Sequence, residues 1–166
     1  MLIDNIVHLR DHIAPGTRLM GLDVGSKTVG VAVSDGAWIV ASPVKTVRRT
    51  RMAADAAAVF AMADERGVGA LVIGLPVNMD GSEGPRCQSV RAFAQNLLAV
   101  RALPTVFWDE RWSTMAVERA MIAADLSRAK RAKAVDAAAA AYILQGALDR
   151  LAGPGAGPPA APLVGG

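Results

Sequence analysis

Residues 70–76, ALVIGLP, form a continuous apolar run that ends in glycine, leucine and proline. A strand with apolar side chains on both faces must be covered on both faces, which is typical of a parallel strand in an α/β protein. The flanking segments fit this requirement. Residues 51–67 are alanine-rich, with apolar spacing near 3.6 and Gly67 as a stop, and residues 86–100 form a second helical pattern. The run therefore predicts a buried strand between two crossover helices.

The rest of the pattern adds strands before this unit, and a strand and helices after it. Three strand-like segments come first, joined at the start by the tight turn 25–28; they are residues 18–24, 29–35 and 38–47. A short strand at 104–108, a helix that Ser113 or Thr114 can cap, and a last helix at 135–151 after a basic loop complete the order. The predicted fold class is α/β with a mixed sheet: an antiparallel meander, then parallel strands, with helices on both faces.

The chain is expected to form one domain with an extension at each end. Its 166 residues suit a single domain with its own core. Residues 1–18 read as a short helical arm, residues 19–150 as the folded domain, and residues 151–166, rich in glycine, proline and alanine, as a disordered tail. The arm lacks the apolar segment of a secretory signal, and no run approaches the roughly 18–20 apolar residues of a membrane helix. We therefore expect a cytoplasmic protein without a membrane partner.

Three carboxylate positions stand out because each lies where burial of a charge needs an explanation. Asp23 is near the end of the first strand of the hairpin, and the neighbouring Gly21 and Gly25 leave room beside it. Bonding to turn amides is the alternative explanation for this aspartate. Asp109 and Glu110 end a parallel-type strand at its carboxyl edge, where open α/β sheets place their sites. Because adjacent strand residues point to opposite faces, one of these two is expected to meet Asp23.

Asp136 begins the last predicted helix, at the head of its apolar stripe. Capping of the helix is the alternative role for this residue. The only histidines, His8 and His12, lie in the arm, and Cys87 is the single cysteine, so imidazole and thiolate ligands are missing from the rest of the chain. Three carboxylates without such ligands describe a site for Mg²⁺ or Mn²⁺, which suits cleavage of a phosphodiester.

Basic residues provide a candidate contact surface for a polyanion in a chain of net charge +3. One run precedes Asp136 and is expected to steer phosphates; it contains Arg128, Lys130, Arg131 and Lys133. A second run, Lys45, Arg48, Arg49 and Arg51, is interpreted as a solvated loop. Ser82, followed by Gly84 and Pro85, begins a helix whose free amides could receive a phosphate, with an ordinary Asp80–Gly81 turn as the alternative.

Four segments then resemble one known family in order and spacing: GLDVGSKTVGVAVSD, GLPVNMDGSEGP with VRAFAQNL, DERWST, and VDAAAAAYILQGALD. They are similar to the YqgF-like pre-16S rRNA nucleases, also described as Holliday junction resolvases, over about residues 19–150. The resemblance implies a ribonuclease-H-like fold and a bacterial nuclease that matures the 5′ end of 16S rRNA. It also implies that the catalytic metal ligands are Asp23, Glu110 and Asp136, and that the basic turn position is Lys27.

The predicted substrate-binding residues, taken together, are Lys27, Ser82, Arg86, Arg111, Arg128, Lys130, Arg131 and Lys133. Pre-rRNA and branched DNA both remain as partners, and the protein could be a monomer or a homodimer. An actin-like ATPase domain is the rival interpretation, because Asp-x-Gly-Ser before a hairpin also resembles the phosphate-binding turn of that class. Such ATPases clasp their nucleotide between two domains, whereas this chain has the length of one and no internal repeat.

Overall fold

The computed structural model describes residues 1–112 and 128–153, with side chains in 1–111 and 137–153. The strands are β1 (Leu2–Ile3), β2 (Arg18–Val24), β3 (Thr28–Ser34), β4 (Ala41–Arg48), β5 (Val68–Leu75) and β6 (Thr105–Asp109). The α-helices are α1 (Met52–Arg66), α2 (Pro85–Val100) and α4 (Arg128–Ala152), and the 3₁₀ helices are η1 (Ile6–His12) and η2 (Glu110–Trp112).

The strands form one mixed sheet in the order β1-β6-β5-β2-β3-β4. β2, β3 and β4 pair antiparallel, whereas β2, β5, β6 and β1 pair in parallel. The predicted meander followed by parallel strands is therefore confirmed, and the β2–β3 hairpin lies centrally. The apolar run at residues 70–76 belongs to β5, which lies between β2 and β6.

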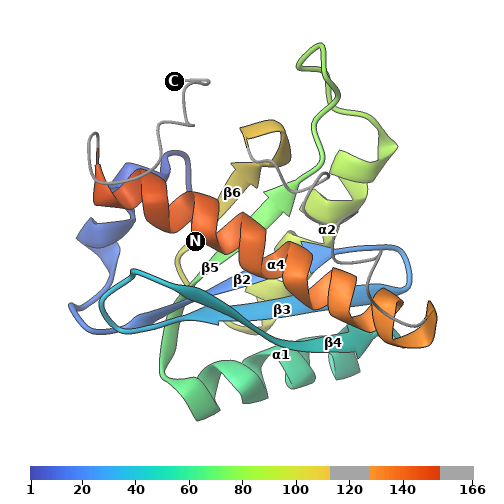
Figure 1. Cartoon of the computed structure of the whole chain (residues 1–166), viewed down its shortest axis with the longest axis horizontal. Helices are drawn as coiled ribbons and strands as arrows, with labels where there is room; N and C mark the ends of the chain where they lie inside the picture. Colours follow the sequence, from blue (N-terminus) through green and yellow to red (C-terminus); the bar gives the residue numbers. More distant parts are fainter. Residues whose placement is uncertain (113–127, 154–166) are drawn as a thin grey trace.

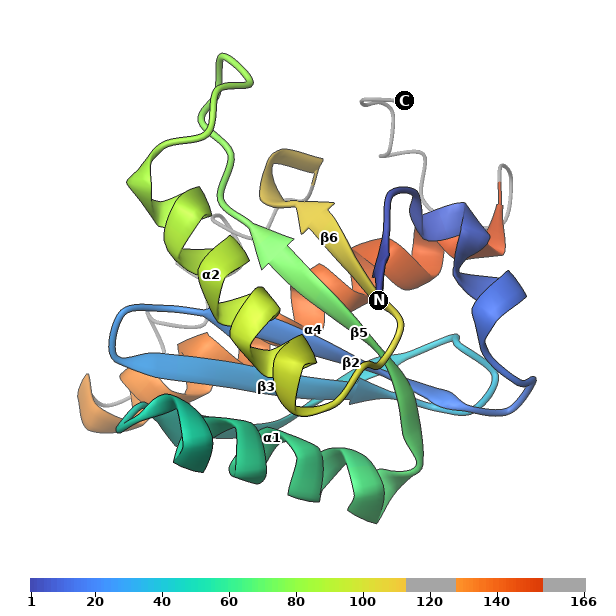
Figure 2. The same ribbon diagram turned by 180° about the vertical axis from the view of Figure 1, so that it is seen from behind.

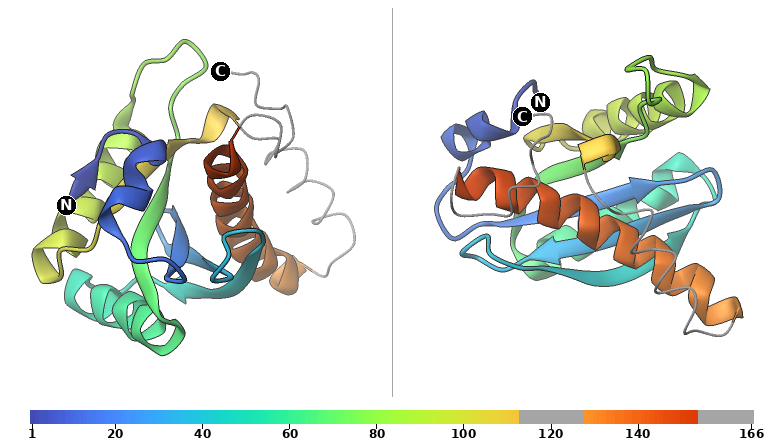
Figure 3. Two further views of the ribbon diagram at one scale, coloured as in Figure 1. Left: turned by 90° about the vertical axis from the view of Figure 1, so that its left-hand side faces the viewer. Right: turned by 45° about the horizontal axis from the view of Figure 1, so that its top comes forward.

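Helices cover both faces of the sheet, as predicted. α4 crosses one face diagonally (Figure 1), and α1 and α2 pack on the other (Figure 2). Figure 3 shows the resulting three layers, with the sheet between them. The side chains of β5 alternate between two cores: Ala70 and Val72 pack on the α4 side, and Leu71 and Ile73 pack on the α1/α2 side. All four are fully buried, which explains why the run is apolar throughout.

Small residues let α4 lie close against the sheet. A Cβ at Gly21 would stand only 2.8 Å from the carbonyl oxygen of Ala140 and 2.8 Å from Cβ of Leu144. The alanines of the helix and the glycine of β2 thus allow backbone-to-backbone packing that a larger side chain would prevent. Gly67, predicted to stop α1, takes the left-handed conformation at its C-cap, with φ 67°.

Two sequence predictions differ from the structure. The predicted helical arm does contain a short helix, the 3₁₀ helix η1, but it also contains the unpredicted strand β1, which pairs with β6, and Leu9 of η1 is fully buried. A two-residue strand has no periodicity that a sequence pattern could reveal. The predicted basic loop before the last helix is also wrong, because α4 already begins at Arg128.

The proposed caps Ser113 and Thr114 and most of the predicted tail lie outside the described residues. No helix in the described part of the chain is long and apolar enough to cross a membrane.

Candidate active site

Asp23 lies one residue before the end of β2, on the face that α4 covers. Leu19 packs in the core on the α4 side, whereas Met20 and Leu22 pack in the opposite core. Strand alternation therefore turns Asp23 toward α4. The residue is partly buried. Its direct partner across the antiparallel pair is Gly30 of β3, so the neighbouring position on that side carries no side chain.

Glu110 lies on the other side of Asp23 from Gly30, over the neighbouring strand β5. The parallel register of β2 and β5 aligns Leu22 with Ile73, which makes Asp23 and Gly74 neighbours. Because Gly74 has no side chain, the Glu110 carboxylate fits above it: its Oε2 is 3.0 Å from where a Cβ would stand. Adjacent strands lie about 4.8 Å apart. Residues far apart in sequence thus bring two carboxylates to neighbouring positions on the α4 face.

Asp109 takes a different place from Glu110. Phe107 packs on the α1/α2 side and Trp108 on the α4 side, so alternation turns Asp109 away from Asp23. Its carboxylate accepts from Nε of Arg111 at 3.0 Å and from Nη2 at 2.6 Å, and the side chain is 12% exposed. This pairing raises the pKa of Arg111. Asp109 is thus engaged in an ion pair on the α1/α2 face.

Arg111, predicted to bind substrate, connects β6 to the loop after β5. Besides the ion pair with Asp109, its Nη1 lies 3.4 Å from the carbonyl oxygen of Met79. The side chain keeps 30% of its surface exposed. The contacts that the structure gives this guanidinium are therefore those of a brace between η2 and the loop.

The loop after β5 is a compact turn built on its own polar groups. The Ser82 hydroxyl donates to Asp80 at 2.6 Å, and Nδ2 of Asn78 donates to the Ser82 oxygen at 3.1 Å. The hydrogen bonds that Ser82 donates through its hydroxyl and its amide lower the pKa of the Asp80 carboxyl. Gly81 has φ 91°, which a tight turn requires here. The contacts of Ser82 are those of the Asp80–Gly81 turn, the alternative raised from the sequence.

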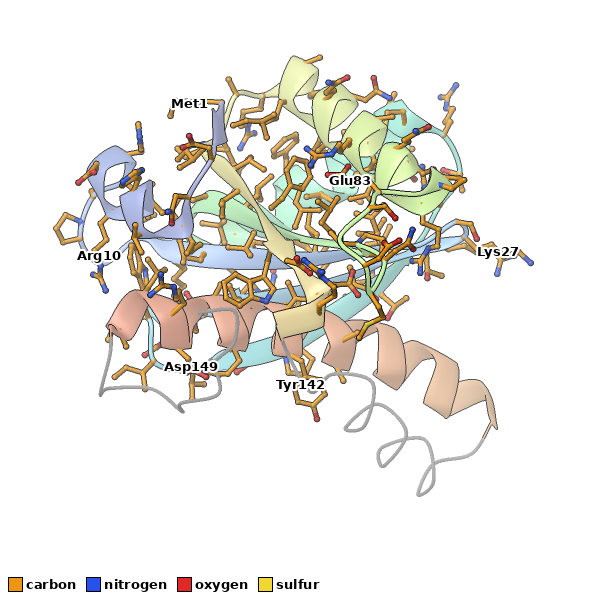
Figure 4. The ribbon with its side chains drawn as sticks, turned by 90° about the horizontal axis from the view of Figure 1, so that it is seen from above. Met1, Arg10, Lys27, Glu83, Tyr142 and Asp149 are labelled. Carbon is orange, nitrogen blue, oxygen red and sulfur yellow. The ribbon has the colours of Figure 1, made fainter. Side chains whose placement is uncertain are left out.

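Arg86 is exposed in the first turn of α2. This helix begins after Gly84 without a side-chain cap, and Pro85 occupies its first turn. Beside it, Glu83 accepts from Nε and Nη2 of Arg91, both at 2.7 Å, and this pairing lowers the pKa of Glu83. Figure 4 shows Glu83 on the α2 side of the sheet, across the sheet from α4.

Lys27 is exposed at the tip of the β2–β3 hairpin, at the end of the molecule opposite Arg10 (Figure 4). Its carbonyl oxygen accepts from the amide of Arg49 at 2.8 Å. The guanidinium of Arg49 donates to the Gly25 carbonyl at 2.7 Å, and its Nε lies 3.9 Å from the buried carboxylate of Asp55. Arg49 therefore joins the hairpin turn to the start of α1, a role that the sequence, read as a solvated loop, did not reveal.

Asp136 lies in the interior of α4, the ninth residue of a helix that begins at Arg128. Capping groups lie at the first turn, so the helix-cap alternative for Asp136 is wrong. Its backbone is one turn before Ala140, whose carbonyl lies over Gly21, two residues from Asp23. The side chain of Asp136 lies outside the described residues.

The four predicted phosphate-steering residues also lie in α4, in its first two turns. They are Arg128, Lys130, Arg131 and Lys133. Their backbone is helical rather than looped, and their side chains lie outside the described part. Among the side chains that the structure does describe, no three histidine, cysteine or acidic residues gather in a metal-binding group. Two of the three predicted ligands, Asp23 and Glu110, belong to that part.

Gly74 is the site residue that sequence reasoning missed. A glycine inside an otherwise apolar strand often marks the close approach of another group, and that was the available signal. In the structure, the approaching groups are the Glu110 carboxylate and the side chain of Ile143 from α4.

Comparison with known proteins identifies relatives over most of the chain. The family model RuvX, described as Holliday junction resolvase, matches residues 17–150. Two curated relatives are each named "Putative pre-16S rRNA nuclease". One, from Sphingopyxis alaskensis, is 62% identical over 136 residues, covering 82% of this chain and 89% of its own length. The other, from Novosphingobium aromaticivorans, is 55% identical over 153 residues, covering 92% and 98%.

Among solved structures, the chain is similar to Thermus thermophilus RuvC, described as "T. thermophilus RuvC in complex with Holliday junction substrate". The TM-score is 0.56 at 15% identity, with 82% of this chain and 96% of the other covered. At this identity the similarity bears on the fold, and it confirms the predicted ribonuclease-H-like class. These relatives favour the nuclease interpretation over the actin-like ATPase.

Proposed function

The chain belongs to the RuvX family, and on that premise we propose that it is a nuclease that hydrolyses phosphodiester bonds at the carboxyl edge of β2 and β5. The proposed catalytic residues are Asp23, Glu110 and Asp136. The observation that carries this assignment is the Glu110 carboxylate above Gly74, next to Asp23 on the adjacent strand. Two acidic side chains brought together from β2 and η2 concentrate negative charge at one place on the α4 face.

The residues of this site fit divalent metal ions. Carboxylate oxygens are the ligands that Mg²⁺ and Mn²⁺ prefer. Softer donors lie elsewhere in the described structure: His8 and His12 are in η1, and the buried Cys87 packs in the core on the α1/α2 side. We therefore propose Mg²⁺ or Mn²⁺, held by Asp23, Glu110 and Asp136. Bound there, such ions would activate a water and stabilise the leaving oxygen of the phosphodiester.

The chain's own residues would orient this chemistry. β2 fixes Asp23 through pairing on both sides, and Gly74 gives Glu110 its place. We propose that Lys27 of the hairpin tip and the basic first turns of α4 hold the substrate backbone, because both belong to the end of the molecule where Asp23 lies. Figure 1 places the hairpin turn and these helical turns at the same end. The brace from Asp109 through Arg111 would keep η2, and with it Glu110, in position.

For the substrate we propose pre-16S rRNA, which the names of the curated relatives print, and within it the 5′ end that the family resemblance implies. We accordingly propose a location in the bacterial cytoplasm, where rRNA is processed. Four-way DNA is the second candidate, favoured by the description of the family and by the fold shared with RuvC. A four-way junction has two-fold symmetry and would suit a homodimer, whereas trimming of an RNA end needs one protomer.

The test is cleavage of a pre-16S rRNA fragment and of a four-way junction by the purified protein, with Mn²⁺ or Mg²⁺ and with chelator. Asp23→Asn and Glu110→Gln should each abolish cleavage and weaken metal binding while the fold survives. Asp109→Asn, one residue from Glu110 but on the opposite face, is the matched comparison and should reduce cleavage less, because it weakens the brace to Arg111 without removing a metal ligand. If Asp109→Asn abolishes cleavage and Glu110→Gln does not, the ligand is misassigned. If Asp23→Asn, Glu110→Gln and Asp136→Asn all leave metal-dependent cleavage intact, the nuclease site lies elsewhere.

A further inference from the structure

The basic run Lys45, Arg48, Arg49 and Arg51, which the sequence suggested is a solvated loop, separates into residues with different roles once the strand register is known. Arg49 is engaged with Gly25 and Asp55. Lys45 and Arg48 are both exposed and both lie on the edge strand β4. They face opposite sides of the sheet, and only one of the two sides carries the proposed site.

Arg48 lies on the side of the carboxylates. Its direct cross-strand partner is Thr28 of β3. Two residues further along β3 is Gly30, the direct partner of Asp23. Since directly opposite residues in an antiparallel pair point to one face, and faces alternate along a strand, Arg48 shares the α4 face with Asp23.

Lys45 lies on the other side. Its cross-strand partner is Val31, whose side chain is buried in the core under α1 and α2. A register irregularity between Val31 and Ala32 adds a residue to β4 just before Lys45. Because of this bulge, alternation counted along the sequence alone does not predict which face a residue of β4 occupies.

Lys27 completes the arrangement around Arg48. The amide of Arg49, next to Arg48, donates to the Lys27 carbonyl, so the end of β4 lies directly against the hairpin tip. The two exposed cationic residues Lys27 and Arg48 therefore belong to neighbouring backbone segments, the turn and the end of β4. Moving from β2 to β4 crosses two strand spacings, about 10 Å. Arg48 is also offset from Asp23 by two residues along the strands, so it lies beside the carboxylates rather than over them.

We propose that Arg48, together with Lys27, forms a phosphate-contacting surface that holds the nucleic-acid backbone to one side of the scissile bond, in the direction of β4. The proposal rests on the proposed nuclease function, and it assigns to Arg48 a role that the sequence pattern did not. Charge complementarity supports a nucleic-acid occupant, since the two cations extend a site whose carboxylates alone would repel a phosphate backbone.

The test separates binding from cleavage. The full chain is titrated into a fluorescein-labelled pre-16S rRNA fragment in chelator, and the affinity is measured by anisotropy over a range of salt concentrations. Arg48→Gln should weaken binding and reduce the slope of log K against log salt by about 0.7–0.9, the value for one lost phosphate contact. Lys45→Gln, which removes the same charge from the same strand on the opposite face, should leave the slope unchanged, and Arg48→Lys should restore most of it.

Phosphate-ethylation interference on the same RNA gives the position. Ethylation of a phosphate that flanks the cleavage point on one side should weaken binding of the wild type but not of Arg48→Gln. Equal slopes for Arg48→Gln and wild type, or equal losses for Arg48→Gln and Lys45→Gln, would overturn the proposal while leaving the nuclease function intact. A wild-type chain that binds the RNA but never cleaves it would instead contradict the nuclease function, and the salt slopes would still decide the role of Arg48.

Discussion

Substitution of Gly74 by alanine tests whether the place of Glu110 depends on a missing side chain. The new Cβ would stand 3.0 Å from Oε2 of Glu110, 3.1 Å from Cγ1 of Ile143, and closer than van der Waals contact to the Cδ1 of Ile143. Ordinary contact begins near 3.4 Å, so the carboxylate must retreat by a few tenths of an ångström. Both neighbouring groups are the far ends of side chains, which can move without unfolding the sheet.

Overpacking of this kind costs about 1–3 kcal/mol of unfolding free energy. For a chain of this length, each kcal/mol lowers the melting temperature by about 2–4 °C. The functional loss should be larger than this stability loss suggests. A misplacement of 1 Å in an active site costs on the order of 100-fold in rate, so the smaller shift at Glu110 should reduce cleavage by about tenfold. Affinity for Mn²⁺, measured by calorimetric titration, should fall as well.

Gly69→Ala is the matched control on the same strand. Its Cβ would clash with the methyl group Cγ2 of Thr17, again the end of a movable side chain, at the opposite end of β5. Both variants should therefore lose similar stability in thermal unfolding, and only Gly74→Ala should lose metal affinity and cleavage. If Gly74→Ala cleaves as fast as Gly69→Ala and binds Mn²⁺ as tightly, the Glu110 carboxylate above Gly74 is not a metal ligand.

Two further predictions concern stability. Arg49→Gln removes the hydrogen bond to Gly25 and the charge beside the buried Asp55, so it should lower the free energy of unfolding by about 1–3 kcal/mol in chemical denaturation. Its control, Arg66→Gln, removes an exposed ion pair with Glu65 and should change this free energy by less than about 1 kcal/mol. Equal losses in the two variants would contradict the role of Arg49. The backbone amides of Val40 and Ile39 donate to the Asp35 carboxylate and hold its pKa below the ordinary 3.8. The charged carboxylate therefore stabilises the folded state fully at pH values well above 3.8, and this contribution to the unfolding free energy is lost as the pH falls below 3.8. The difference in unfolding free energy between wild type and Asp35→Asn should therefore close in urea titrations as the pH drops below 3.8, and a difference independent of pH would refute this account.

Local patterns in the sequence were sufficient for the order of elements from β2 to β6. The apolar run of β5, the alanine-rich α1 and the stop at Gly67 each depend on residues close together in the chain, and all appear in the structure. The rule that sites of α/β sheets gather at the carboxyl edge of the strands also pointed to the Asp109–Glu110 pair.

Patterns without an apolar stripe were less informative. The first two turns of α4 contain good helix formers, but the sequence there predicted a loop because basic residues recur without an apolar stripe. The two-residue β1 forms because it pairs with β6, and pairing with a distant segment leaves no trace in local periodicity.

Only the tertiary structure could decide which face each candidate side chain occupies. Strand alternation predicts that Asp109 and Glu110 point to opposite faces of the sheet. Which of the two meets Asp23 depends on which face α4 covers and on the space above Gly74. The same holds for Arg48 and Lys45: their odd spacing puts them on opposite faces, but which face each occupies depends on the pairing of β4 with β3. The physical reason is that period and propensity act between neighbours along the chain, whereas register and close packing are set by contacts between segments far apart in it.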